Sequence, residues 1–87
     1  MLGDRLKEIE YVKKSEKRVN VLKSLDGEVK IPSEIAEDAQ ILQNHISKTL
    51  RQLREHGLIE CINPEAKRGR LYRLTDKGKR IMGDLNG

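Results

Sequence analysis

Apolar residues recur at intervals of three or four along most of the chain, which is the spacing of amphipathic helices. The first series is Leu2, Leu6, Ile9 and Val12. It predicts a helix over residues 4–12. Ser15 is a favourable N-cap residue, so we expect a break there and a second helix whose apolar positions are Val19, Leu22 and Leu25. Gly27 then follows as a C′ residue that ends this helix in a left-handed conformation.

A second pair of helices is expected after an extended connection over residues 28–31. Pro32 suits the first position of a helix, because its missing N–H is not needed there. It predicts a short helix over residues 32–39, with Ile31 as a poor cap. Residues 40–42 would then turn into the next helix. Two helices joined by a turn of about three residues form a helix-turn-helix.

The stretch QNHISKTLRQLREHG, residues 43–57, predicts the second of these helices. At roughly 100° per residue, one side of the helix carries Ile46, Leu50 and Leu53. The opposite side carries Asn44, Lys48, Arg51 and Glu55. A helix with this polar face and an apolar stripe behind it suits the major groove of DNA.

The pattern changes to that of a hairpin after Gly57, which is placed to end the long helix. Residues 58–63, LIECIN, are rich in apolar and β-branched residues and predict a strand. Residues 70–74, RLYRL, alternate and predict its partner, with a basic turn between them. Thr75 and Asp76 cap a last helix, in which one face carries Ile81, Met82 and Leu85.

Composition limits the class of protein. A chain of 87 residues with 36% hydrophobic and 37% charged residues predicts one domain with a modest core. Apolar runs of two or three residues exclude a membrane span, and the charged start MLGDRLKEIE is unlike a secretory signal, so we expect a cytoplasmic protein. Tyr11 and Tyr72 are the only aromatic residues. This argues against single-strand binders, which stack bases on several aromatic rings.

Positive charge is concentrated in two short segments. Their charged residues are Lys48, Arg51, Arg54 and Glu55 within 43–56, and Lys67, Arg68, Arg70 and Arg73 within 67–73. The segments therefore hold net charges of +2 and +4, whereas the other 11 basic and 13 acidic residues sum to −2. A localised basic surface favours phosphate binding. The alternative is that both segments are ordinary solvated surfaces.

Four stretches resemble small winged helix-turn-helix transcriptional regulators of the ArsR/MarR sort, especially those common in archaea. They are YVKKSEKRVNVLKSL, PSEIAEDA, ISKTLRQLREHGLIE and PEAKRGRLYRLTDKGK, within residues 11–82. The resemblance implies a mainly α fold with a small β-hairpin (α+β), in one domain over residues 1–87. The helix-turn-helix would span about 32–57, the wing about 58–74 and the C-terminal helix about 75–86.

The resemblance also implies a partner, double-stranded DNA, and a site. A recognition helix over 43–56 would enter the major groove, and a basic wing over 64–73 would reach the backbone or the minor groove. The groove-facing residues would be Gln43, Asn44, His45, Ser47, Lys48 and Arg51, and the wing contacts Lys67, Arg68 and Arg70. Two positions depart from the family's pattern: Gln40 stands where glycine is common, and Leu42 where a capping Ser or Thr is common.

Individual side chains admit alternatives. Gln43 and Asn44 can read adenine through N6 and N7, but Asn44 can equally cap the helix. Arg51 can grip guanine or a phosphate, and phosphate is favoured because most protein–DNA hydrogen bonds go to the backbone. His45 is either a base contact or a surface histidine. For the whole chain, the alternatives to a specific regulator are a protein-interaction module and a non-specific, chromatin-like DNA binder.

No enzyme, metal or cofactor is expected. The sequence contains no phosphate-binding glycine loop, paired-carboxylate site or Ser/His/Asp pattern. Cys61, His45 and His56 lack the spacing of a metal site, and the cysteine motif of metal-sensing ArsR proteins is absent.

The apolar stripes at the two ends of the chain raise the question of oligomeric state. They could pack together within one chain, or across a twofold axis. We expect a homodimer through the terminal helices.

Overall fold

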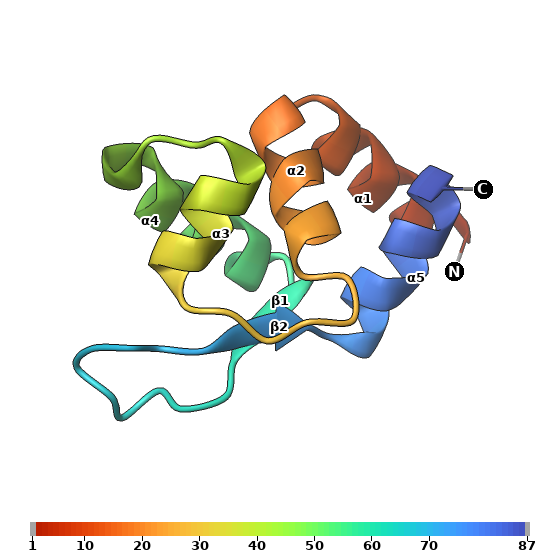
Figure 1. Ribbon diagram of the computed structural model, residues 1–87. Coiled ribbons are helices and arrows are strands. Elements are labelled where there is room, and N and C mark those ends of the chain that lie inside the picture. Colours follow the sequence, from red (N-terminus) through yellow and green to blue (C-terminus); the bar gives the residue numbers. More distant parts are fainter. Residues whose placement is uncertain (1, 87) are drawn as a thin grey trace.

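The computed structural model describes the backbone of residues 2–86 and the side chains of residues 5–86. Within this part of the chain, five helices and one β-hairpin follow each other, which confirms the predicted winged helix-turn-helix fold (Figure 1). The elements are α1 (Leu2–Lys13), α2 (Glu16–Ser24), α3 (Pro32–Ala39), α4 (Gln43–Glu55), β1 (Ile59–Cys61), β2 (Tyr72–Leu74) and α5 (Asp76–Asn86).

The predicted break between the first two helices is confirmed at Ser15. Its hydroxyl oxygen accepts the backbone N–H of Arg18 at 3.4 Å, and this caps α2. The predicted end of α2 was wrong, because the helix ends slightly earlier in the chain. The helix stops at Ser24 with Leu25 as its cap, and Gly27 lies in the following turn with φ +72°. The turn forms because the N–H of Glu28 returns to the carbonyl of Leu25 at 3.1 Å.

The start of α3 matches the prediction from Pro32, which occupies the first helical turn. Ile31 cannot cap the helix with its own side chain, but Glu34 Oε1 accepts the backbone N–H of Ile31 at 3.2 Å. At the other end, Gln40 takes the left-handed conformation, with φ +57°. The N–H of Ile41 then bonds the carbonyl of Ala36 at 2.9 Å, so an amide residue makes the turn in which glycine is common.

The end of α4 uses the same geometry with a glycine. The helix stops at Glu55, His56 caps it, and Gly57 has φ +72°. The N–H of Leu58 bonds the carbonyl of Leu53 at 3.0 Å, which reverses the chain into β1. The regular helix therefore ends one residue before the end of the recognition helix predicted over 43–56.

The hairpin is antiparallel and pairs Ile59 with Leu74 and Cys61 with Tyr72. Both strands are shorter than the predicted segments 58–63 and 70–74 because Asn63 replaces the next backbone partner. The side-chain oxygen Oδ1 of Asn63 accepts the N–H of Leu71 at 2.6 Å. The segment before α3 also pairs with the outer edge of β2, through an isolated antiparallel bridge between Lys30 and Tyr72.

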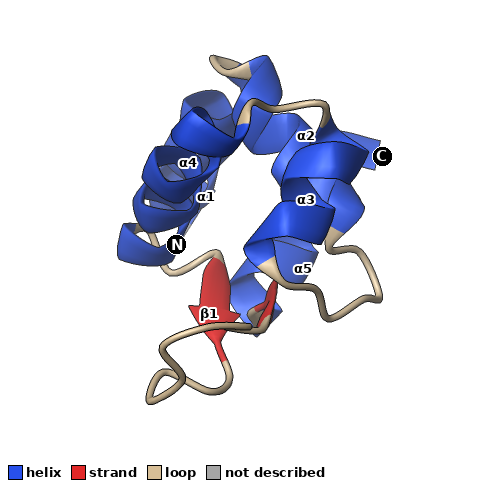
Figure 2. Cartoon of the chain, turned by 60° about the vertical axis from the view of Figure 1, so that its left-hand side comes forward, coloured by secondary structure: helices blue, strands red, loops and turns tan. Residues whose placement is uncertain are grey.

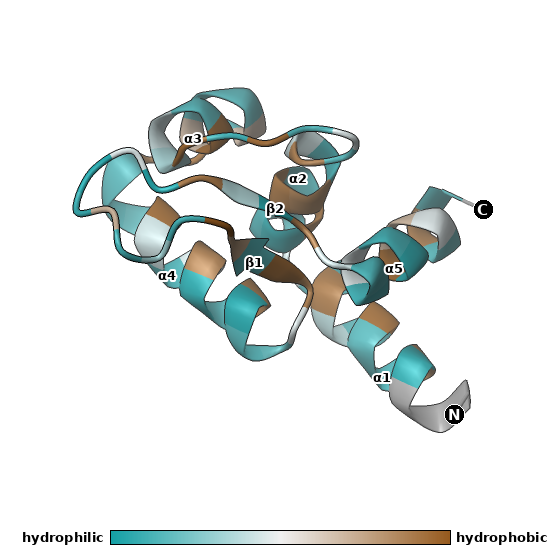
Figure 3. Ribbon diagram, turned by 90° about the horizontal axis from the view of Figure 1, so that it is seen from below, coloured by the Kyte–Doolittle hydropathy of each residue, from teal (hydrophilic) through white to brown (hydrophobic). Residues whose placement is uncertain are grey.

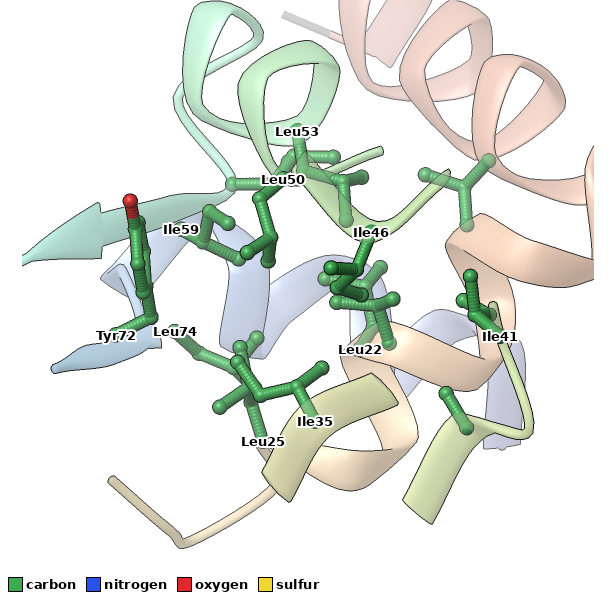
Figure 4. Close-up of a cluster of buried hydrophobic side chains, with 14 of the residues drawn as sticks. Leu22, Leu25, Ile35, Ile41, Ile46, Leu50, Leu53, Ile59, Tyr72 and Leu74 are labelled. Carbon is green, nitrogen blue, oxygen red and sulfur yellow. The ribbon is translucent and has the colours of Figure 1, made fainter. Parts of the chain in front are cut away.

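An aliphatic core joins the helices to the hairpin, as the composition predicts (Figure 4). Figure 2 shows the hairpin at one end of the helical body, with its loop extending beyond it. Fully buried side chains from all five helices and β1 fill the centre, among them Val12, Leu22, Ile35, Ile59 and Ile81. Among the described residues, no helix has the length and apolar content needed to cross a membrane.

The terminal helices α1 and α5 contact each other within the chain. Arg5 Nε and Nη2 each donate to the carboxylate of Asp84 at 2.6 Å. These hydrogen bonds hold the pKa of the Asp84 carboxyl below its ordinary value. Ile81 and Met82 are buried, but Leu6 on α1 remains 59% exposed. The predicted contribution of the Leu2 side chain lies outside the described residues.

Candidate nucleic-acid interface

The outer face of α4 carries the residues predicted to contact a groove. Ile46, Leu50 and Leu53 are buried, as is Thr49, whose hydroxyl donates to the carbonyl of His45 at 3.3 Å. The predicted groove residues all lie exposed on this helix: Gln43, Asn44, His45, Ser47, Lys48 and Arg51. The side of the helix that faces solvent is therefore rich in amide and basic groups.

The N-terminal end of α4 is open to an anionic partner. Helices α2, α3 and α5 each have an acidic residue in the first turn: Glu16, Glu34 and Asp76. Helix α4 has none, and Leu42 at its N-cap makes no side-chain hydrogen bond to it. The positive end of its dipole is therefore not neutralised from within the first turn.

Helix α2 contributes a basic residue that the sequence analysis missed. Lys17 Nζ lies 3.2 Å from His45 Nδ1, at the first turn of α4. An ammonium group can only donate, so this contact forms as a hydrogen bond in the neutral imidazole tautomer whose N–H is on Nε2. The run KKSEKR between the first two helices was the only signal, and it did not indicate which helix it would approach.

The wing is organised by Asn63. Besides accepting from Leu71, its side chain donates through Nδ2 to the carbonyl of Gly69 at 3.1 Å. Gly69 has φ +66°, a conformation that side chains disfavour. Arg70 Nε bonds the carbonyl of Ala66 at 2.8 Å, which closes the loop further. The sequence analysis did not identify Asn63; the only local signal was the turn-forming pair Asn63-Pro64.

The wing and α4 share a surface depression of about 370 Å³, which we call the basic groove. Its charged lining residues are Arg51 and Arg54 from α4 and Lys67 and Arg70 from the wing. Figure 3 shows the wing loop beside α4, with mainly hydrophilic residues on both. Four cations around a concave surface suit an anionic chain.

The basic groove unites part of the predicted site. Ser47, Arg51, Lys67 and Arg70 line it. The other predicted contacts are exposed but do not line it: Gln43, Asn44, His45, Lys48 and Arg68. Arg54 also lines the groove, although it was not among the predicted contacts.

Arg73 lies elsewhere. Although it belongs to the basic segment 67–73, its Nε donates to Glu60 Oε2 at 2.9 Å. Both side chains line a separate depression near the start of α5, together with Lys79. Arg73 therefore offers the same charge as Arg70 on the same hairpin, outside the basic groove.

The C-terminal end of α4 is anchored on α1. The rings of Tyr11 and His56 stack with centroids 3.7 Å apart and an interplanar angle of 14°. The guanidinium carbon of Arg18 lies 3.8 Å from the centroid of Tyr11. His56 Nδ1 also lies 3.0 Å from Glu8 Oε2. These contacts hold the direction of α4 relative to the body of the protein.

No group of three or more potential metal ligands occurs in the part of the chain that the structure describes. Cys61 is partly buried, and its thiol lies 3.5 Å from Asn63 Oδ1 at the base of the wing.

Comparisons with known proteins agree with this architecture. Residues 13–87 match the winged helix-turn-helix family. The HTH-type transcriptional regulator BilQ of Clostridioides difficile (strain CD3) is 32% identical over 54 residues, which cover 61% of this chain and 36% of BilQ. The chain thus matches about a third of the length of this curated relative.

Two solved structures are similar over nearly the whole chain. The transcriptional repressor CouR, bound to a 23-mer DNA duplex, has a TM-score of 0.75 at 27% identity, covering 97% of this chain and 61% of CouR. The homodimeric winged helix-turn-helix DNA-binding domain of Mb0332 from Mycobacterium bovis, a possible ArsR-family regulator, has a TM-score of 0.76 at 19% identity, covering 98% and 78%.

These relatives are regulators rather than enzymes, and they confirm the resemblance to small winged-helix regulators. The matched residues 13–87 include the whole helix-turn-helix, the hairpin and α5. By sequence and by fold, this chain belongs to the winged helix-turn-helix family.

Proposed function

We infer that this protein is a DNA-binding transcriptional regulator that reads duplex DNA with α4 in the major groove. The basic wing, residues 64–73, contacts the backbone or the adjacent minor groove. The observation that carries this proposal is the basic groove, where cations from α4 and the wing face one depression. A phosphate strand running between the two elements would meet Arg51, Lys67 and Arg70 together.

The N-terminal turn of α4 is the part that reads bases, since the N-terminal residues of a recognition helix contact base edges. Asn44 is exposed there and can bond adenine through N6 and N7. His45 can donate through an Nε2–H group to an acceptor such as guanine N7. Lys48 and Arg51, about one and two turns beyond Asn44, hold the flanking backbone.

Binding to duplex DNA should weaken steeply with salt. If the four cations of the basic groove neutralise phosphates, they alone make the logarithm of the association constant fall with log salt at a slope of about −3.6. Phosphate contacts of Lys48 and Arg68, which lie outside the groove, make the slope steeper. Fluorescence anisotropy on a duplex selected from a random pool measures this slope. Undetectable duplex binding at low salt would overturn the proposal and favour a protein-interaction role.

Asn44→Ala separates a sequence-specific regulator from a general DNA binder. Loss of a base contact should reduce affinity for the selected duplex by about tenfold, on the order of 1–3 kcal/mol, while leaving affinity for random duplex unchanged. An equal affinity of the unmutated protein for selected and random duplexes at physiological salt would indicate the chromatin-like alternative.

We also propose a homodimer formed through the terminal helices. Leu6 supports it, because a leucine 59% exposed on α1 is available to a second copy even though α1 and α5 already contact each other. A twofold axis at this end would present two α4 helices to successive turns of the duplex.

Leu6→Glu should convert the dimer to a monomer, because a carboxylate cannot be buried unpaired in an apolar interface. Sedimentation equilibrium measures the change in mass. Val29→Glu, at an exposed valine in the loop before α3, is the control and should leave the dimer intact. A monomeric mass for the unmutated protein would end this part of the proposal.

A further inference from the structure

Leu42 is an apolar residue at a helix position that favours polar side chains. Its carbonyl accepts the N–H groups of His45 at 2.9 Å and Ile46 at 3.1 Å, so it occupies the N-cap of α4. Its side chain makes no capping hydrogen bond and is 66% exposed, more than any other large hydrophobic side chain among the described residues. Serine is among the most favourable N-cap residues and leucine among the least favourable.

Helices α2, α3 and α5 solve the same problem differently. Ser15 caps α2 and Thr75 caps α5 with hydroxyl groups. Ile31, the apolar cap of α3, is half-buried and is compensated by the Glu34 carboxylate. Leu42 has neither burial nor a compensating acid. A serine at this position would therefore stabilise the isolated domain more than Leu42 does.

The surroundings of Leu42 identify what could cover it. It stands at the tip of α4, next to the exposed side chains of Gln43 and Asn44, and its helix turn also carries the Lys17–His45 pair. In Figure 1 this end of α4 lies on the far side of the molecule from both termini, so the dimer contact proposed above does not reach it. An amide-rich and basic setting suits a duplex, rather than an apolar protein surface.

We propose that Leu42 is a specificity-determining residue that contacts the C5-methyl group of a thymine in the major groove. Thymine is the base that presents an apolar group there, and apolar side chains read it by direct contact. This inference rests on the proposed entry of α4 into the major groove. Leu42 then adds an apolar contact to the polar contacts of Asn44 and His45.

The test replaces thymine by uracil, which removes only the methyl group. The probe is the tightest duplex selected from a random pool, with each thymine replaced in turn. At one position the unmutated protein should lose about fourfold in affinity, the equivalent of one buried methyl group at ~0.8 kcal/mol. Leu42→Ser should bind the thymine and uracil duplexes equally, and Leu42→Met should keep the difference.

The second readout needs no DNA. Leu42→Ser should raise the Tm of the free protein by about 4 °C, because a serine hydroxyl can cap α4. Val29→Ser is the control, since Val29 is also an exposed apolar residue but lies away from the start of α4. This variant should have the Tm of the unmutated protein and should lose the same affinity when thymine is replaced by uracil.

The possible outcomes distinguish the role of Leu42 from the proposed function of the whole protein. Tight duplex binding with no uracil effect at any position, or a selected duplex without thymine near the base-contact positions, would overturn the role of Leu42 alone. A lower Tm for Leu42→Ser would also overturn it, since Leu42 would then serve the fold. Failure to bind any duplex would overturn this role and the proposed function together.

Discussion

Gly78→Ala is expected to destabilise the protein by about 3 kcal/mol, although alanine is the better helix former. Gly78 is buried in α5, and a Cβ there would lie 2.0 Å from the carbonyl oxygen and 3.0 Å from the carbonyl carbon of Leu58. Both are backbone atoms at the junction of α4 and β1. Relief of this clash requires α5 or the start of the hairpin to move.

Leu58 cannot easily yield, because its backbone is bonded on both sides. Its N–H completes the end of α4 at the carbonyl of Leu53, 3.0 Å away, and its carbonyl accepts the N–H of Thr75 at 3.1 Å. Equilibrium urea denaturation followed by far-ultraviolet circular dichroism measures the loss of stability.

Gly83→Ala is the matched control in the same helix. No atom lies within 4 Å of the Cβ that this change would add, so the substitution should stabilise the protein by roughly 0.5–1 kcal/mol. The two changes are chemically identical and are expected to have opposite signs. A Gly78→Ala protein as stable as the Gly83→Ala protein would show that α5 does not sit against Leu58 as described.

The double change Arg68→Ala and Arg70→Ala is expected to weaken duplex binding by about 100-fold at low salt. Each arginine that bonds a phosphate should contribute on the order of 1.5 kcal/mol. The loss should be similar for selected and random duplexes, because phosphates carry no sequence information. The salt slope should become shallower by about 2, since two fewer phosphates are neutralised. Fluorescence anisotropy across a salt series measures both quantities.

A second double change, Arg73→Ala with Lys79→Ala, removes the same charge from the other side of the hairpin. Both residues line the separate depression near α5. At about 0.1 M salt this variant should lose less than threefold in affinity, because its charges lie outside the basic groove and salt screens them over a Debye length of roughly 10 Å. Equal losses for the two pairs would mean that net charge, rather than the wing, governs binding.

The sequence was sufficient for most of the secondary structure, because the signals for it are local. Ser15, Pro32, Gly57 and Thr75 each act on backbone groups within about one helical turn, and the structure has helix boundaries at all four. The spacing of Ile46, Leu50 and Leu53 likewise determined which side of α4 is buried. The fold class followed from these elements and their order.

Other features depend on contacts between residues that are far apart in the sequence, and only the tertiary structure determined them. Glycine is unfavourable inside a helix, and only the approach of Leu58, 20 positions earlier in the chain, makes Gly78 necessary in α5. Strand lengths depended on Asn63 reaching Leu71 across the wing. These effects arise from atoms that folding brings together from distant positions, so no window of sequence shows them.

The candidate site divides in the same way. Its basic and amide residues were predicted from the sequence, by the resemblance to winged-helix regulators together with the helical spacing of residues 43–56 and the charge of the two basic segments. Only the fold brings Arg54 of α4 to the same groove as Lys67 and Arg70 of the wing, Lys17 to His45, and Arg73 to the opposite side with Glu60. Charge along the chain is a property of sequence, whereas the surface on which charges meet is determined by how helices and hairpin pack.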